Sequence, residues 1–218
     1  MRAQRQVPWM TVMMVLGLLA TPSLRAADAT TIATQGNGRG AAPCQSCHGA
    51  DGGGMSAAGF PRLAGLDAGY LRKQLDDFAT GTRDNPVMHP NAQALSDDER
   101  QAMANYYARM PIPKLTPSTP PPDDTGHLLA TRGRWAQQVP ACEQCHGPGG
   151  IGVGANFPPL AGQPAAYLEN QLHAWKAGTR HNDPLQLMQG ISRALDDNDI
   201  HAVAAWFAAQ SMAAGGAP

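Results

Sequence analysis

Side chains in residues 67–79 recur every three to four positions, which places them on one face of a helix. The stripe consists of Tyr70, Leu71, Gln74, Leu75 and Phe78. Gly81 is placed to end this helix. A further helix is predicted from Ser96, because residues 96–99, SDDE, have the form of a capping box, and a short helix is expected ahead of the first cysteine pair. No alternating run of apolar and polar residues predicts a strand, so the pattern favours an all-α fold.

The same pattern occurs twice along the chain. Residues 44–49, CQSCHG, return as residues 142–147, CEQCHG, and residues 60–65, FPRLAG, return as residues 157–162, FPPLAG. The helix stripe of the first copy also returns, at Tyr167, Leu168, Gln171, Leu172 and Trp175. Self-similarity of this kind predicts two copies of one domain in tandem.

The repeat predicts domains at residues 27–110 and 126–218. Between them, residues 111–125 are rich in proline, which disfavours a helix and predicts an extended linker. The repeat and this short connection suggest that the two halves pack against each other.

Residues 1–26 have the form of a signal peptide. Arg2 and Arg5 precede an apolar run that is too short for a confident membrane span, and small residues follow near Ala26. Export to the periplasm is therefore expected, with an uncleaved membrane anchor as the alternative. Removing this segment takes away three of the 16 basic side chains and none of the 17 acidic ones, which leaves a formal charge of −4. That charge argues against a nucleic-acid partner.

The composition is poor for an apolar core. Aromatic residues make up 6% of the chain, which also contains 24 Gly and 19 Pro. Each half is small, and small domains bury a limited share of their surface. A bound group is therefore expected to fill the middle of each half.

All four cysteines lie in pairs of the form Cys-x-x-Cys-His. The first pair is Cys44 and Cys47, followed by His48, and the second is Cys142 and Cys145, followed by His146. This is the attachment sequence of c-type haem. Two thiols three positions apart can form thioethers with one porphyrin, and the adjacent histidine can bind the iron. The sequence therefore predicts two covalently attached c-type haems.

Two other uses of the cysteines fit the sequence less well. An exported chain can form disulfides or a dithiol redox site, but neither needs a histidine directly after each pair. A zinc site needs four ligands, whereas the two pairs lie in separate repeats and no pair of histidines at finger spacing follows either one.

His48 and His146 are expected as one axial ligand of each iron. The carbonyl groups of Pro61 and Pro158 are candidates to accept a hydrogen bond from the second ring nitrogen of each histidine. The alternative is that these prolines only shape the turn.

Met88 and Met188 are the candidates for the second axial ligand. They are the methionines outside the leader that occupy matching places in the two copies, each in a predicted loop opened by a proline. His89 and His181 compete for the role, although their places in the repeat do not match. The remaining histidines have no counterparts and are expected to be ordinary polar residues: His127, His173 and His201.

Together these motifs resemble the dihaem cytochrome c4 family, which consists of tandem class I cytochrome c domains. The resemblance covers the chain after the leader and depends on residues 44–49, 60–65 and 81–88 with their counterparts. It implies a periplasmic protein, sometimes associated with the membrane, that passes single electrons between respiratory complexes and terminal oxidases or other acceptors. The first methionine loop departs from the second, because it is shorter and places His89 beside Met88.

We predict an electron carrier without catalytic residues, whose partners are redox proteins such as a respiratory complex, an oxidase or a dehydrogenase. The alternatives are a haem enzyme in which one iron has an exchangeable sixth ligand, and an electron-accepting subunit of a dehydrogenase complex. For Arg83 and Arg180 two positions are expected as alternatives, either near the haem propionates or on the solvated surface.

Overall fold

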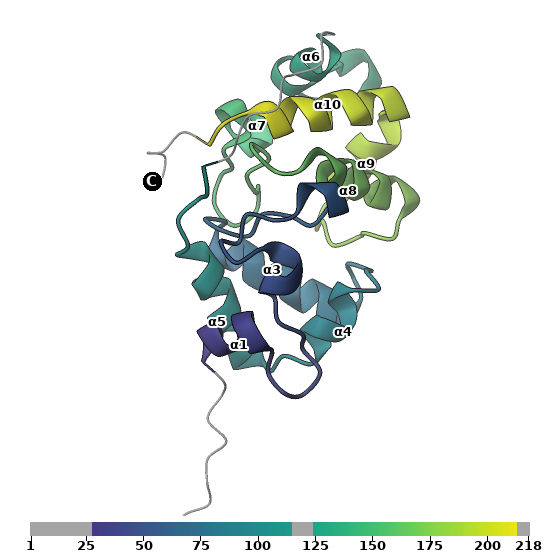
Figure 1. Ribbon diagram of the computed structural model, residues 1–218. Helices are drawn as coiled ribbons and strands as arrows, with labels where there is room; N and C mark the ends of the chain where they lie inside the picture. Colours follow the sequence, from purple (N-terminus) through teal and green to yellow (C-terminus); the bar gives the residue numbers. More distant parts are fainter. Residues whose placement is uncertain (1–27, 115–123, 213–218) are drawn as a thin grey trace, which may run out of the picture.

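The computed structural model describes residues 28–114 and 124–212 (Figure 1). The predicted signal peptide and the middle of the predicted linker lie outside these residues. Helices and short 3-10 turns are the regular elements of the described chain, together with isolated bridges. No helix within the described ranges is long and apolar enough to cross a membrane.

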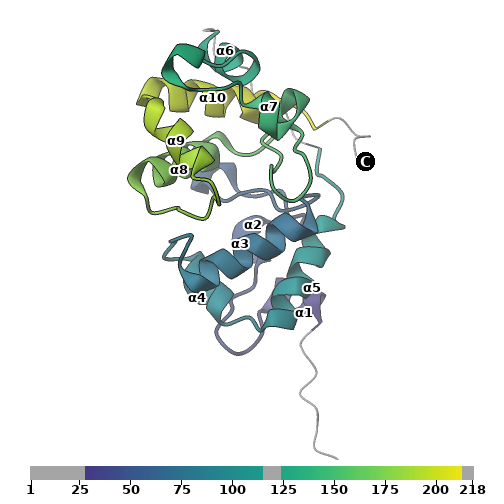
Figure 2. The same ribbon diagram turned by 180° about the vertical axis from the view of Figure 1, so that it is seen from behind.

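The first half contains five α-helices and one 3-10 turn, in the order α1 (Ala29–Gln35), α2 (Gln45–His48), η1 (Ser56–Ala58), α3 (Ala68–Thr80), α4 (Met88–Gln93) and α5 (Asp97–Ala108). The second half follows the same order with two 3-10 turns: α6 (Thr125–Thr131), η2 (Trp135–Gln137), α7 (Glu143–His146), η3 (Pro148–Gly150), α8 (Ala165–Ala177), α9 (Leu187–Ala194) and α10 (Asp197–Ala209). The halves stack on each other, and α3 and α8 lie near their junction in both views (Figures 1 and 2). The all-α fold of two tandem domains is thus confirmed.

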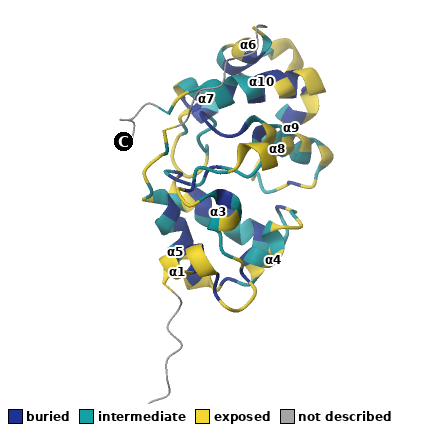
Figure 3. Cartoon of the chain, in the orientation of Figure 1, coloured by how far each residue is buried: buried dark blue, intermediate teal, exposed yellow. Residues whose placement is uncertain are grey.

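Each half has its own small cluster of buried apolar side chains. In the first half, α1, α3 and α5 supply Ile32, Leu71 and Met103. In the second half, α6 and α10 supply Leu129, Ile200 and Phe207. Buried residues lie on the inward sides of these helices and exposed ones on the outward sides (Figure 3).

The long helices begin and end where the sequence predicts. The carboxylate of Asp67 accepts a hydrogen bond from the N–H of Tyr70 at 3.0 Å and caps α3, and Gly81 ends that helix with a φ of 84°. The capping box predicted at Ser96 is present, and Asp196 forms its counterpart at the start of α10.

Two short helices were not predicted. Met88 is the first residue of α4 and Met188 the second residue of α9, where the sequence predicted loops. The carbonyl oxygen of the Asn85 side chain accepts the N–H groups of Val87 at 3.0 Å and Met88 at 2.8 Å, so it starts α4. Pro90 is tolerated because it lies in the first turn, where the backbone N–H has no partner within the helix. The nearby prolines therefore led to the prediction of loops where the structure has short helices.

A buried carboxylate fixes the start of the last helix in each half. Glu99 has a fully buried side chain, accepts the N–H of Ser96 at 2.9 Å and forms an ion pair with Arg39. Asp199 occupies the matching place and pairs with Arg134. These pairs join each last helix to the loop ahead of a cysteine motif.

We expect Glu99→Gln to lower the free energy of unfolding by about 1–3 kcal/mol, because it removes the charge from buried hydrogen bonds. Burial raises the pKa of the Glu99 carboxyl, but the bonds from Ser96, Arg39 and Asn37 outweigh burial and hold this pKa below its ordinary 4.5. The charged carboxylate therefore stabilises the fold above pH 4.5, and this contribution is lost as the pH falls through the lower folded value. Urea unfolding across this acidic range measures both effects.

Asp98→Asn is the matched control, because Asp98 lies exposed in the same first turn of α5. An equal loss of stability in both variants would contradict the assignment to the buried carboxylate.

Candidate functional site

Each cysteine motif forms one turn of helix. In α2 the N–H of His48 bonds to the carbonyl oxygen of Cys44 at 3.0 Å, and the turn ends at Gly49. In α7 the same bond joins His146 to Cys142 at 2.9 Å. Side chains three apart on a helical turn lie on the same face, so each turn presents both thiols of its pair toward one place.

The histidine of each motif bonds to a proline carbonyl. Nδ1 of His48 lies 3.0 Å from the carbonyl oxygen of Pro61, and Nδ1 of His146 lies 2.8 Å from that of Pro158. A carbonyl only accepts, so Nδ1 is the donor and Nε2 keeps its lone pair in the neutral ring. Burial lowers the pKa of both histidines, although the bonds to the prolines oppose it. The predicted acceptor role of both prolines is confirmed.

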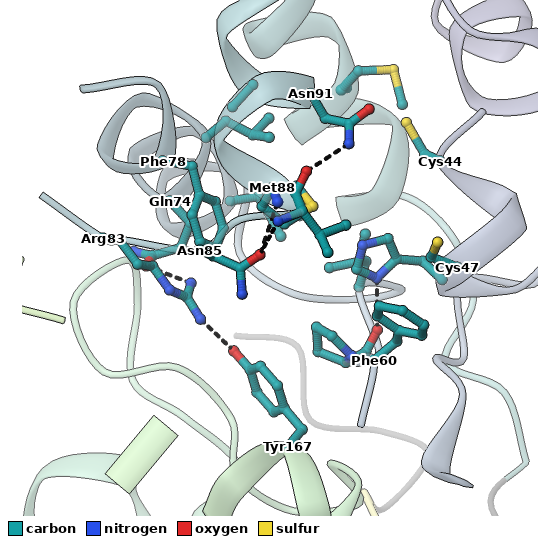
Figure 4. Close-up of a pocket in the computed structure, with 18 of the residues that line it drawn as sticks. Cys44, Cys47, Phe60, Gln74, Phe78, Arg83, Asn85, Met88, Asn91 and Tyr167 are labelled. Carbon is teal, nitrogen blue, oxygen red and sulfur yellow. Dashed lines mark hydrogen bonds between the residues drawn. The ribbon is translucent and has the colours of Figure 1, made fainter. Parts of the chain in front are cut away.

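A cavity of about 380 Å³ opens beside the first motif. Cys44, Cys47 and His48 line one side, and Met88 lines it from the start of α4 (Figure 4). The remaining wall is mainly apolar, with Leu71, Leu75, Phe78, Leu95 and Met103 among its residues. Two thiols, an imidazole and a thioether around an apolar space fit a covalently attached haem with two axial ligands.

The thiols do not form disulfides. Cys44, Cys47, Cys142 and Cys145 are all free, and burial raises the pKa of Cys44 and raises that of Cys142 to about 12. Within the described ranges no cluster of three or more His, Cys, Asp or Glu side chains is placed to hold a metal ion, which a zinc site would need. The donor set therefore fits the haem prediction better than either alternative.

The histidines that compete with the methionines make other contacts. Nδ1 of His89 lies 2.7 Å from the carbonyl oxygen of Phe78, and the backbone N–H of His181 donates to the carbonyl oxygen of Thr82 at 3.1 Å. Met188 is half-buried near the start of α9. The other histidines have ordinary polar or ring contacts: His127 with Trp206, His173 with Asp197, and His201 with Glu169.

Two arginines meet at the junction of the halves. Arg83 and Arg180 are only 6% and 4% exposed, so the solvated-surface interpretation of both is wrong. Arg83 donates to Oε1 of Gln74 at 2.9 Å and of Gln171 at 2.6 Å, and Arg180 donates to the same two oxygens at 3.1 Å and 2.9 Å. Each guanidinium thus binds one glutamine from its own half and one from the other, and the expected packing of the halves is confirmed.

The first cavity is completed by the second half of the chain. Tyr167, Gln171 and Arg180 line it together with residues of the first half. The hydroxyl of Tyr167 accepts a bond from Arg83 at 3.0 Å, which Figure 4 shows across the cavity. Burial raises the pKa of Tyr167, but the two guanidiniums outweigh it and lower this pKa. Positive charge is therefore concentrated at this side of the cavity.

Sequence reasoning missed one further pair at the junction, Arg62 and Gln163. The backbone N–H and carbonyl of Arg62 bond to the side-chain amide of Gln163, both at 3.0 Å. Arg62 matches Pro159 in the second copy, and Gln163 matches Leu66 in the first. These two differences between the copies were the signal in the sequence that could have indicated the pair.

The comparisons with known proteins agree with this geometry. The family model for cytochrome c matches residues 35–110 and 132–211. A thiosulfate dehydrogenase electron acceptor from Stutzerimonas stutzeri strain A1501 is 53% identical over 197 residues, which cover 89% of this chain and 91% of that protein. The crystal structure of reduced cytochrome c4 from Pseudomonas stutzeri superposes with a TM-score of 0.72 at 34% identity, and covers 77% of this chain and 93% of that one.

A longer protein also contains a similar region. The structure of a thiosulfate dehydrogenase from Marichromatium purpuratum superposes with a TM-score of 0.79 at 44% identity. The match covers 86% of this chain but 41% of that one, so this chain spans about two-fifths of the longer protein.

We expect Gln74→Leu to lower the free energy of unfolding by about 2–4 kcal/mol. The substitution leaves donors of Arg83, Arg180 and Asn182 without their shared acceptor at a buried place. Denaturant unfolding followed by circular dichroism measures the loss. Gln101→Leu, on the exposed side of α5, is the control, and a similar effect of the two substitutions would count against the crossed arginine cluster.

Proposed function

The chain belongs to the dihaem cytochrome c4 branch of the cytochrome c family, and on that premise we propose that each Cys-x-x-Cys-His motif attaches one haem and supplies one axial ligand, His48 or His146. The family binds two covalent c-type haems and transfers electrons rather than catalysing a reaction on a substrate. The observation that carries the residue assignment is the cavity beside the first motif, with both thiols and His48 on one side and Met88 on another.

We propose Met88 and Met188 as the second axial ligands. Met88 lines the cavity, whereas His89 is engaged with the carbonyl of Phe78. Met188 is the second residue of the matching short helix in the second half. Met88 and Met188, together with the motif histidines, would give each haem iron two protein ligands, and the haem would supply one-electron transfer without an open coordination position. This favours an electron carrier over the alternative of a haem enzyme with an open site.

The two buried arginines are proposed to face haem propionates. Arg83 and Arg180 form no ion pair among the described side chains, and both line the first cavity. Burying unpaired positive charge is costly unless an anion compensates it. Propionate carboxylates are anions of the right chemistry for guanidinium groups.

The proposed electron donor is a thiosulfate dehydrogenase. The relative from Stutzerimonas stutzeri is named as the electron acceptor of that enzyme, and the longer protein from Marichromatium purpuratum bears the enzyme's name and contains a region like this chain. Terminal oxidases or other redox proteins would then take the electrons onward. Residues 1–26 support export, so the proposed place of this transfer is the periplasm.

We expect Met88→Ala and Met188→Ala each to open one iron without preventing haem attachment. Each variant should bind carbon monoxide at one haem in the reduced state, and the potential of that haem should fall, because thioether ligation favours reduced iron. An optical redox titration with carbon monoxide added at the reduced end measures both properties. Met110→Ala is the control, and a variant that binds no carbon monoxide and keeps its potential would refute that methionine as a ligand.

We expect thiosulfate to reduce the haem-loaded protein when a catalytic amount of thiosulfate dehydrogenase is present. The absorbance of ferrous haem should rise until both haems are reduced, and it should stay constant when either the enzyme or thiosulfate is omitted. Failure of the complete mixture, in a sample that dithionite reduces fully, would exclude this donor while leaving the haem sites in place.

A further inference from the structure

Arg62 is a fully buried charge between the two halves. It is 0% exposed. Its two neighbours in the sequence, Pro61 and Leu63, line the first cavity, whereas Arg62 itself does not. One terminal nitrogen donates to the carbonyl oxygen of Ala64 at 2.6 Å and the other to that of Ala161, in the second half, at 3.2 Å. Nε has no hydrogen-bond partner among the described residues.

No carboxylate balances this charge. The ion pairs of the described side chains do not include Arg62, and its partners are two neutral carbonyl groups. Burial lowers the pKa of Arg62 to about 10, so the guanidinium still carries its charge at neutral pH. A buried cation without an anion costs stability, and neutral donors could satisfy the same two carbonyls. Packing alone therefore does not explain why a charge stands here.

The charge lies against the segments that hold both axial histidines. Arg62 directly follows Pro61, whose carbonyl accepts Nδ1 of His48. Its contact Ala161 lies three residues after Pro158, whose carbonyl accepts Nδ1 of His146. Because the second copy has Pro159 at the matching place, Arg62 has no symmetric counterpart in the second half.

We propose that Arg62 acts in electron transfer as a fixed positive charge that raises the reduction potential of both haems. An added electron at either iron is attracted by a nearby cation, and this attraction is strong where water is excluded. The proposal rests on the haem sites proposed above. A neutral side chain could make the hydrogen bonds of Arg62, so the proposed role depends on its charge.

The test compares Arg62→Gln, which is neutral and keeps hydrogen-bond donors, with Arg62→Lys, which keeps the charge. In the haem-loaded full chain, optical redox titration should show lower potentials for both haems in R62Q. The equilibrium constant for reduction should fall roughly tenfold. R62K should stay close to the parent protein. The shift in R62Q should persist at high salt, because the site is buried and mobile ions do not screen it.

Gln163→Leu is the matched control, because it removes the clamp on the backbone of Arg62, leaves the charge, and installs the residue that the other copy has at this place. Its potentials should equal those of the parent. Unchanged potentials in R62Q, or equal shifts in R62Q and R62K, would overturn the proposal and leave Arg62 as a structural clamp. If R62Q does not fold, R62M tests the same loss of charge.

The proposed effect of the Arg62 charge and the proposed haem sites are tested by different measurements. A low-spin ferrous spectrum that is inert to carbon monoxide in R62Q would show that the haem sites and their ligands are intact, whatever the potentials do. Binding of carbon monoxide by the parent protein would instead contradict the proposed ligands.

Discussion

The hydrogen bond from the motif histidine to a proline carbonyl fixes the geometry on which the rest of each half depends. It joins the one-turn helix of the cysteines to the loop that follows, so the thiols, the imidazole and this loop keep one relative placement. The loop can approach this closely only because Gly54 has no side chain: with a φ of 84°, a Cβ there would lie 2.6 Å from the carbonyl oxygen of Phe60. Gly152 plays the same part against Pro159 in the second half. Both glycines also donate their N–H groups to the carbonyl oxygens of the motif histidines, His48 and His146.

Much of this arrangement follows from the sequence because it depends on local chemistry. Helix periodicity located α3, capping residues located the start of α5, and the repeat located their counterparts. The acceptor role of Pro61 and Pro158 also followed, since an axial histidine needs a partner for its second nitrogen. The haem prediction itself needed only the doubled Cys-x-x-Cys-His motif.

What the sequence did not yield is of two kinds, short helices beside prolines and contacts between distant residues. Helices α4 and α9 are short and have prolines near them, and the turn held by the Asn85 side chain directly precedes α4, at a place where a loop was the natural prediction. The burial of Arg83 and Arg180 could not be read from either half alone, because each guanidinium finds a partner in the opposite half. A charged residue near a glycine looks the same in a sequence whether it faces water or another domain.

The junction makes the two halves one structural unit. Tyr167 and Arg180 of the second half line the cavity of the first, so this cavity is incomplete when the first half stands alone. The crossed bonds of the two glutamines would be lost if the halves separated, so these bonds favour the packed arrangement. An electron carrier gains from such a junction, since a fixed distance between two sites allows transfer within the molecule without a search by diffusion. The same arginines that hold the halves together thus place positive charge beside the cavity in which we propose that the first haem lies.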